Sequence, residues 1–153
     1  MIVVDVPPEE ADDFLTACNK HSLAYVPLVA PTSTDARLAS VAKVAKGYIY
    51  CVSVTGVTGA RTELPPGLGD FLARVRGAVG AELPLAVGFG LSTHEHIKSV
   101  GEFADGAVMG SAVIRSLRSD GAEGIEAFVR GIVTGEKPTT MTAGAMAEGA
   151  GGK

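Results

Sequence analysis

The chain has 153 residues, 46% of them hydrophobic, and a formal net charge of −4 at pH 7. This length suffices for one domain with a core of its own, and the hydrophobic share excludes an intrinsically disordered chain. Because Lys and Arg never cluster and no apolar run approaches the roughly 18 residues that span a bilayer, the sequence predicts neither a nucleic-acid partner nor a membrane partner.

The amino-terminal third of the chain predicts two strands, each followed by an amphipathic helix. A strand is expected at residues 2–6, and Pro7 and Pro8 then start a helix with an acidic first turn that runs to about residue 20. A second strand is expected at 24–29. Ser33 or Thr34 can then cap the next helix, because a hydroxyl accepts a hydrogen bond from the first helical turn. The helical spacing places one apolar face on this helix, formed by Leu38, Val41, Ala42 and Ala45.

The rest of the chain repeats this alternation and ends in a segment of small residues. A strand is expected at 48–53, followed by a long Gly/Thr loop at 54–66 and a helix around Phe71, Leu72 and Val75. The next strand is expected at 84–88, followed by a helix that Thr93 caps and that carries Ile97, Val100 and Phe103 inward. The last expected elements are a strand at 106–109 and helices at 111–117 and 122–133. Apolar strands alternating with helices predict a parallel α/β protein. An open five-stranded sheet and a piece of a (β/α)8 barrel fit this pattern equally. We expect residues 1–135 to form the domain and 136–153 a flexible tail or linker.

Two consecutive strands end in glycine and hydroxyl residues just before a helix. These ends are Val87-Gly-Phe-Gly-Leu-Ser92 and Val108-Met-Gly-Ser111. Glycine lets the backbone approach a ligand closely, and the N–H groups of a following helix point at an anion. Either turn alone could be a simple tight turn. Because barrels hold phosphate in the loops after their last two strands, the pair together favours a phosphate site.

Other candidate residues are weaker. The loop from Thr55 to Thr62 is long and rich in hydroxyls, so we interpret it as a lid rather than a plain connection. Asp5 follows the first strand and is interpreted mainly as a hydrogen-bond acceptor for the next turn. The histidines offer no ligand set and are expected at the surface, so no metal site is predicted. Cys18 and Cys51 lack metal-ligand spacing and suit a reducing, cytoplasmic compartment.

Five segments together resemble the tryptophan synthase alpha subunit family, in the family's order and spacing. They are Asp5-Val-Pro-Pro-Glu-Glu10, Leu28-Val-Ala-Pro-Thr-Ser-Thr-Asp-Ala-Arg-Leu38, Tyr48-Ile-Tyr-Cys-Val-Ser-Val-Thr-Gly-Val-Thr-Gly-Ala-Arg61, Val87-Gly-Phe-Gly-Leu-Ser92 and Ala104-Asp-Gly-Ala-Val-Met-Gly-Ser111. The resemblance covers about residues 1–133. The second and third segments are highly specific to the family, whereas Gly-Phe-Gly is shared by many phosphate-binding barrels.

The resemblance implies a (β/α)8 TIM barrel that cleaves indole-3-glycerol phosphate into indole and glyceraldehyde 3-phosphate for tryptophan biosynthesis. The alpha subunit needs no cofactor and passes indole to a beta subunit that carries pyridoxal phosphate. The expected partner is such a beta subunit or a fused beta domain, to which the Ala/Gly-rich tail would be the linker. By the same resemblance, the substrate phosphate lies against Gly59, Gly88, Gly90, Gly110 and Ser111, the indole pocket is formed by Tyr50, Phe89, Val108 and Asp5, and Thr58 belongs to the lid.

The resemblance covers only the fourth to eighth strands of the family barrel, so about five βα units are expected here. The family's two catalytic carboxylates lie in the first three units and correspond to no residue of this chain, so no catalytic residue is assigned. Without these carboxylates, we expect the chain alone to be inactive. Because five strands cannot close a barrel, we also expect it to depend on a preceding half or a partner. The alternative is a non-catalytic module that binds phosphate or indole, or docks on a beta subunit. Another sugar-phosphate barrel is a third possibility, but the lid segment argues against it.

Overall fold

The computed structural model describes residues 1–53, 65–88 and 90–136. Its elements, in chain order, are the 3₁₀ helix η1 (Pro8–Glu10), α1 (Asp12–Lys20), β1 (Leu28–Val29), α2 (Asp35–Val44), β2 (Ile49–Val52), α3 (Leu68–Val79), β3 (Leu85–Gly88), α4 (His94–Val100), β4 (Gly106–Val108) and α5 (Ser111–Thr134). The strands form one parallel sheet in the order β1-β2-β3-β4, which confirms the predicted parallel α/β class.

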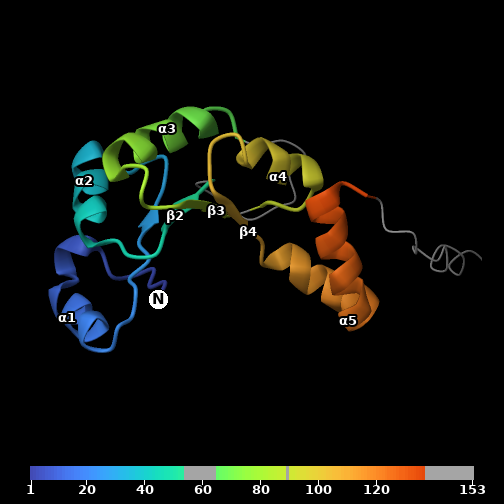
Figure 1. Cartoon of the computed structure of the whole chain (residues 1–153), viewed down its shortest axis with the longest axis horizontal. Helices are drawn as coiled ribbons and strands as arrows, with labels where there is room; N and C mark the ends of the chain where they lie inside the picture. Colours follow the sequence, from blue (N-terminus) through green and yellow to red (C-terminus); the bar gives the residue numbers. More distant parts are fainter. Residues whose placement is uncertain (54–64, 89, 137–153) are drawn as a thin grey trace, which may run out of the picture.

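The elements form an arch rather than a closed body. Figure 1 shows α2, α3 and α4 along the outer side of the sheet, α1 beside α2 at one end, and α5 as a limb beyond β4 at the other end. The two edges of the sheet are therefore far apart and do not pair with each other.

The outer face of the sheet carries the core. Alternate residues of β2 and β3 are buried, and they pack against the inward faces of α2 and α3. The main members of this core are Ile49, Cys51, Leu85, Val87, Leu38, Val41, Phe71, Leu72 and Val75. The helical spacing had predicted the contributions of α2 and α3, and these are confirmed. Burial raises the pKa of the Cys51 thiol to about 12.

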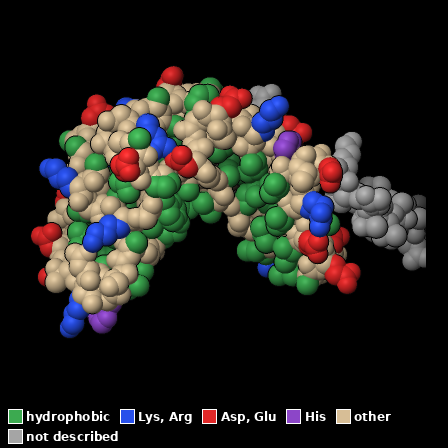
Figure 2. Space-filling model, in the orientation of Figure 1, with side chains coloured by type: hydrophobic (Ala, Val, Ile, Leu, Met, Phe, Trp, Pro, Cys, Tyr) green, Lys and Arg blue, Asp and Glu red, His purple; other side chains and the backbone are tan. Residues whose placement is uncertain are grey.

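The inner face of the sheet is only half buried. Tyr50 and Val52 in β2, Ala86 in β3 and Val108 in β4 alternate with the core residues and are of intermediate exposure. In Figure 2 hydrophobic side chains gather on the concave underside of the arch and on the adjoining side of its right limb. The arrangement matches the inside of a barrel that is open on one side.

The two amino-terminal strands are shorter than predicted. Residues 2–6 are not a strand, because only Ile2 pairs, through an isolated parallel bridge to Val26. The second strand is reduced to Leu28–Val29. Pro27 faces β2, where its carbonyl oxygen accepts the Tyr50 N–H (3.0 Å), but it has no N–H to donate in return, so the second strand begins only at Leu28. After Ile2 the chain turns at Val4 and Asp5, and Val4 is 72% exposed.

Two expectations for the helices also need correction. Residues 111–117 and 122–133 belong to one element, α5, with a kink at Gly121 where the backbone leaves the helical region (φ 68°, ψ −163°). Phe103 does not face the core with Ile97 and Val100, and it is 48% exposed. Because α4 ends at Val100, the helical spacing on which that expectation rested does not extend to Phe103.

Candidate functional site

The two glycine turns lie side by side at the carboxyl edge of the sheet. Gly88 pairs with Val108 across β3 and β4, and Gly90 and Gly110 each follow two residues later. A Cβ atom on either of these two glycines would meet no atom within 4 Å, so both backbones border open space. Gly90 has φ +79°, a conformation that side chains rarely adopt.

The second turn leads directly into the longest helix. Gly110 is the residue before α5, and the exposed Ser111 is its first residue. The first N–H groups of a helix have no partner within the helix, and they lie at the positive end of its dipole. The amino end of α5 therefore offers donors and a favourable field to an anion bound between Gly90 and Gly110.

Tyr50 lies directly over Gly88. A Cβ atom at position 88 would overlap the hydroxyl and ring of Tyr50, so only glycine fits beneath that side chain. Burial raises the pKa of the Tyr50 phenol, with a smaller contribution from Tyr48. Since Val108 pairs with Gly88 and paired residues share a face, the structure brings Tyr50, Gly88 and Val108 together on the inner face.

Side chains from outside the first turn fix both of its ends. Ser53 donates to the Gly88 carbonyl oxygen through its backbone N–H (3.1 Å) and its hydroxyl (2.9 Å). The Ser92 N–H donates to His96 Nδ1 (3.3 Å), and the His96 N–H donates to Thr93 Oγ1 (3.2 Å). The prediction of surface histidines is wrong for His96, which is 4% exposed, because the spacing of His94 and His96 does not indicate which of them faces inward.

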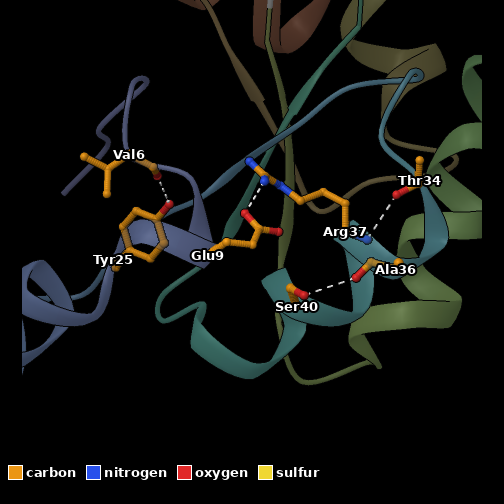
Figure 3. A network of polar contacts seen from close by, with 7 residues as sticks. All are labelled: Val6, Glu9, Tyr25, Thr34, Ala36, Arg37 and Ser40. Atoms are coloured by element: carbon orange, nitrogen blue, oxygen red, sulfur yellow. Dashed lines mark hydrogen bonds and ion pairs between the residues drawn. The ribbon is translucent and has the colours of Figure 1, made fainter.

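Asp5 does not follow a strand as predicted, because it lies in an exposed turn after the single bridge of Ile2. Its neighbourhood is held by the Tyr25 hydroxyl, which donates to the Val6 carbonyl oxygen (2.8 Å), and by an ion pair between Arg37 and Glu9 (Figure 3). Burial raises the pKa of Tyr25, Arg37 opposes this rise and Glu9 adds to it. These contacts tie the first residues of the chain to the segment before β1 and to α2.

Three predicted site residues, Gly59, Thr58 and Phe89, lie outside the described residues. Within the ranges that the structure describes, no group of three or more His, Cys, Asp or Glu residues could hold a metal ion. In the same ranges, no helix is long and apolar enough to cross a membrane.

A hollow of about 520 Å³ lies at the carboxyl end of β1. Its lining includes the hydroxyls of Thr32, Ser33 and Ser40, together with Arg37 and Glu9. Because Glu9 already pairs with Arg37, the cation in this hollow is neutralised. The paired turns after β3 and β4 are therefore the better candidate for an anion.

A family model and the sequence relatives of this chain all belong to the same protein family. The family model described as "Tryptophan synthase alpha chain" matches residues 1–142. The tryptophan synthase alpha chain of Syntrophotalea carbinolica is 44% identical over 131 residues, which are 86% of this chain and 51% of that protein. The corresponding chain of Roseiflexus castenholzii is 50% identical over 114 residues, which are 74% of this chain and 43% of that protein.

A solved structure agrees with the sequence relatives. In the α2β2 tryptophan synthase complex of Pyrococcus furiosus, the matching chain is 35% identical, with a TM-score of 0.74 over 86% of this chain and 54% of that chain. This similarity confirms the prediction that the fold is part of a (β/α)8 barrel. The chain spans about half the length of the relatives it matches.

Proposed function

Because this chain belongs to the tryptophan synthase alpha chain family, we propose that it supplies the phosphate- and indole-binding part of a lyase. The lyase cleaves indole-3-glycerol phosphate into indole and glyceraldehyde 3-phosphate. One observation carries the proposal. Gly88 of β3 pairs with Val108 of β4, and each is followed two residues later by a glycine, Gly90 and Gly110, at the edge of the sheet where Tyr50 covers Gly88.

The phosphate group of the substrate is proposed to bind between the two turns. Gly90 and Gly110 supply backbone that a phosphate can approach without meeting a side chain, and Ser111 supplies a hydroxyl at the start of α5. Gly88, which Tyr50 covers, is proposed to border the phosphate at the strand end. Gly59 is proposed to add a further backbone N–H.

The indole ring is proposed to lie on the inner face of the sheet. Tyr50 and Val108 present apolar surface there, on either side of Gly88. Phe89 and Asp5 are proposed to complete this pocket, and Thr58 to close over it as part of the lid.

The proton transfers of the reaction are proposed to come from outside this chain. Retro-aldol cleavage needs a proton delivered to the indole ring and another removed from the glycerol hydroxyl, and positioned carboxyl groups serve this purpose. The resemblance assigns neither carboxylate of the family to a residue here. We therefore expect the 153-residue chain alone to release no indole, and indole release that is sensitive to Asp5→Asn would contradict this. The partner is proposed to be a beta subunit, as in the α2β2 complex of the Pyrococcus furiosus enzyme.

The phosphate site is tested by Gly110→Leu. The new side chain meets open space and the backbone angles at 110 (φ −112°, ψ −69°) suit any residue, so the fold should tolerate the change while the cradle is filled. Inorganic phosphate is titrated into the full chain and followed by amide NMR shifts. Gly77→Leu is the matched control, because Gly77 also borders open space but lies in α3. Unchanged phosphate affinity in Gly110→Leu would sink the assignment.

A second experiment separates the lyase from a non-catalytic binding module. The chain is mixed with a polypeptide that contains the first three βα units of a relative, and indole release from indole-3-glycerol phosphate is measured. Turnover supports the lyase. Binding of phosphate and indole without turnover in a well-formed mixed complex would favour a module that only binds these groups.

A further inference from the structure

Three polar side chains are buried among the described residues: Ser53 is 2% exposed, His96 4% and Ser116 9%. Burying a polar group is costly unless it is hydrogen-bonded, so such groups usually have a specific role. Two of the three, Ser53 and His96, contact the same short turn between β3 and α4. They come from different elements, since Ser53 follows β2 and His96 belongs to α4.

At the start of the turn, the Gly88 carbonyl oxygen accepts two hydrogen bonds from one residue. The Ser53 N–H continues the pattern of the parallel sheet (3.1 Å), and the Ser53 hydroxyl adds a second bond (2.9 Å). The backbone bond alone would satisfy this carbonyl. The hydroxyl therefore fixes the orientation of the Gly88 peptide more tightly than the sheet requires.

At the end of the turn, His96 and Thr93 bind in a reciprocal manner. Thr93 caps α4 by accepting from the His96 N–H, and the His96 ring reaches back to accept the Ser92 N–H. This resembles a capping box, in which the third helical residue binds a backbone N–H at the helix start, but here the bond is to the residue before the cap. The ring thereby holds the last part of the turn.

Burying the His96 imidazole lowers the stability of the fold in a way that helix capping alone does not explain. Because Nδ1 accepts a hydrogen bond, it carries no proton, and the ring proton is on Nε2. Nε2 is buried and has no hydrogen-bond partner among the described residues. A buried donor without a partner lowers stability, so a side chain selected for stability alone would not leave one at this position.

We propose that Ser53 and His96 are positioning residues for phosphate binding, holding Gly88 at one end of the turn and Ser92 at the other. The inference rests on the proposed function, because it assumes that the phosphate binds beside Gly90. Both side chains act behind the turn and leave the space in front of Gly90 and Gly110 open. The turn then keeps its binding shape in the absence of phosphate. Phosphate binding therefore loses little free energy to ordering the backbone of the turn.

The test uses the full chain, with inorganic phosphate as the probe and the amide shifts of Gly90 and Gly110 as the readout. Ser53→Ala removes the hydroxyl, and His96→Gln places its amide near the Nε2 position and leaves Ser92 without an acceptor. Each should weaken phosphate binding about five- to tenfold, the effect of losing one hydrogen bond. Ser53→Thr keeps a hydroxyl, and His96→Asn keeps an acceptor near Nδ1, so these two should bind within about twofold of wild type, well inside a single bond's effect.

Ser116→Ala is the matched control. Ser116 is the third buried polar side chain, and its hydroxyl also donates to a backbone carbonyl, that of Gly124 (3.0 Å), but inside α5. The Ser116→Ala variant should be destabilised about as much as Ser53→Ala, but it should keep the phosphate affinity of wild type. Hydrogen exchange at the Ser92 amide should accelerate in His96→Gln and stay slow in His96→Asn.

The outcomes separate the two proposals. If wild type binds no phosphate at Gly90 and Gly110, the proposed phosphate site fails and the positioning role fails with it. If wild type binds but Ser53→Ala and His96→Gln bind equally well, only the positioning role is overturned. A loss of affinity in Ser116→Ala as large as in the other two would also overturn it, because general destabilisation would then explain all three variants.

Discussion

The two ends of β3 are held in different ways. At the amino end, the Asp105 carboxylate accepts the Leu85 N–H (2.7 Å) and pairs with Arg76, whose guanidinium also donates to the carbonyl oxygens of Gly80 (3.2 Å) and Leu83 (2.8 Å). At the carboxyl end, the Ser53 hydroxyl holds Gly88, and the His96 ring holds Ser92 in the turn that follows the strand. One end depends on partly exposed charges and the other on buried polar groups.

This difference fits separate roles for the two ends of β3, with ligand binding at the carboxyl end and stability at the amino end. A carboxylate beside a glycine turn would repel an anionic ligand, and at β3 the carboxylate lies at the end away from the glycines. In (β/α)8 barrels the carboxyl ends of the strands carry the site, and the amino ends contribute stability. Substitutions at the two ends of β3 should therefore separate ligand binding from stability.

The largest effect is expected for Gly88→Ala at the carboxyl end. The new Cβ would overlap Tyr50, so the fold should lose up to about 3 kcal/mol of unfolding free energy, as overpacked sites do. Phosphate binding should fall by more than tenfold, because either Tyr50 or the turn beyond Gly88 must shift, and both belong to the proposed site. Urea unfolding and phosphate titration measure the two effects.

A double mutant tests the cause. Adding Tyr50→Ala should restore part of the stability lost in Gly88→Ala, because the obstacle is then absent, and the coupling free energy should exceed about 1 kcal/mol. Strictly additive losses would show that contact with Tyr50 is not the reason for glycine at position 88.

Asp105→Ala should show the opposite profile at the amino end. It leaves the N–H of the fully buried Leu85 without its acceptor and removes the partner of Arg76, which should cost about 1–2 kcal/mol of unfolding free energy. Phosphate affinity should stay at the wild-type value. A parallel loss of affinity would mean that the two ends of β3 are not independent.

The parts of this molecule that could be predicted from the sequence are those set by local rules. Thr34 and Thr93 each cap a helix as expected, because their hydroxyls need only the N–H three residues later. The core faces of α2 and α3 follow from helical spacing. The glycine turns could be located because strand ends in a parallel sheet share one edge, although their binding role stays a prediction.

The features that escaped prediction depend on neighbours distant in the sequence. The fit of Gly88 under Tyr50 needs the register of β2 against β3, which the sequence pattern does not supply. The burial of His96 depends on which side of α4 packs inward. The amino-terminal strand was overpredicted because β-branched residues form a strand only where a neighbour offers a ladder, and here the chain turns at Val4 and Asp5, directly after the single bridge of Ile2 to Val26.

The pH dependence of stability should reveal the contribution of Asp105 at the amino end of β3. The Leu85 N–H and then Arg76 lower the pKa of Asp105 below its ordinary value of 3.8. Its contribution to stability is therefore complete only above about pH 5, roughly one unit above the unfolded-state pKa, and is lost as the pH falls through the lowered pKa. Because the Asp105 side chain is half exposed, this contribution should be below about 1 kcal/mol. Urea unfolding of wild type and Asp105→Asn should differ at neutral pH and converge in acid, and a constant difference would contradict the assignment.

The smallest effect is expected at the ion pair between Arg37 and Glu9, which serves as a comparison for the ion pair of Arg76 at the amino end of β3. Both side chains are substantially exposed (34% and 50%), so Arg37→Gln should cost no more than about 0.5 kcal/mol, and added salt should reduce even that. Arg76 is similarly exposed, at 30%, but it also donates to two backbone carbonyls. Arg76→Gln should therefore cost more than Arg37→Gln in urea unfolding, and the difference should persist in high salt. Equal losses would mean that the backbone contacts of Arg76 add nothing to its ion pair.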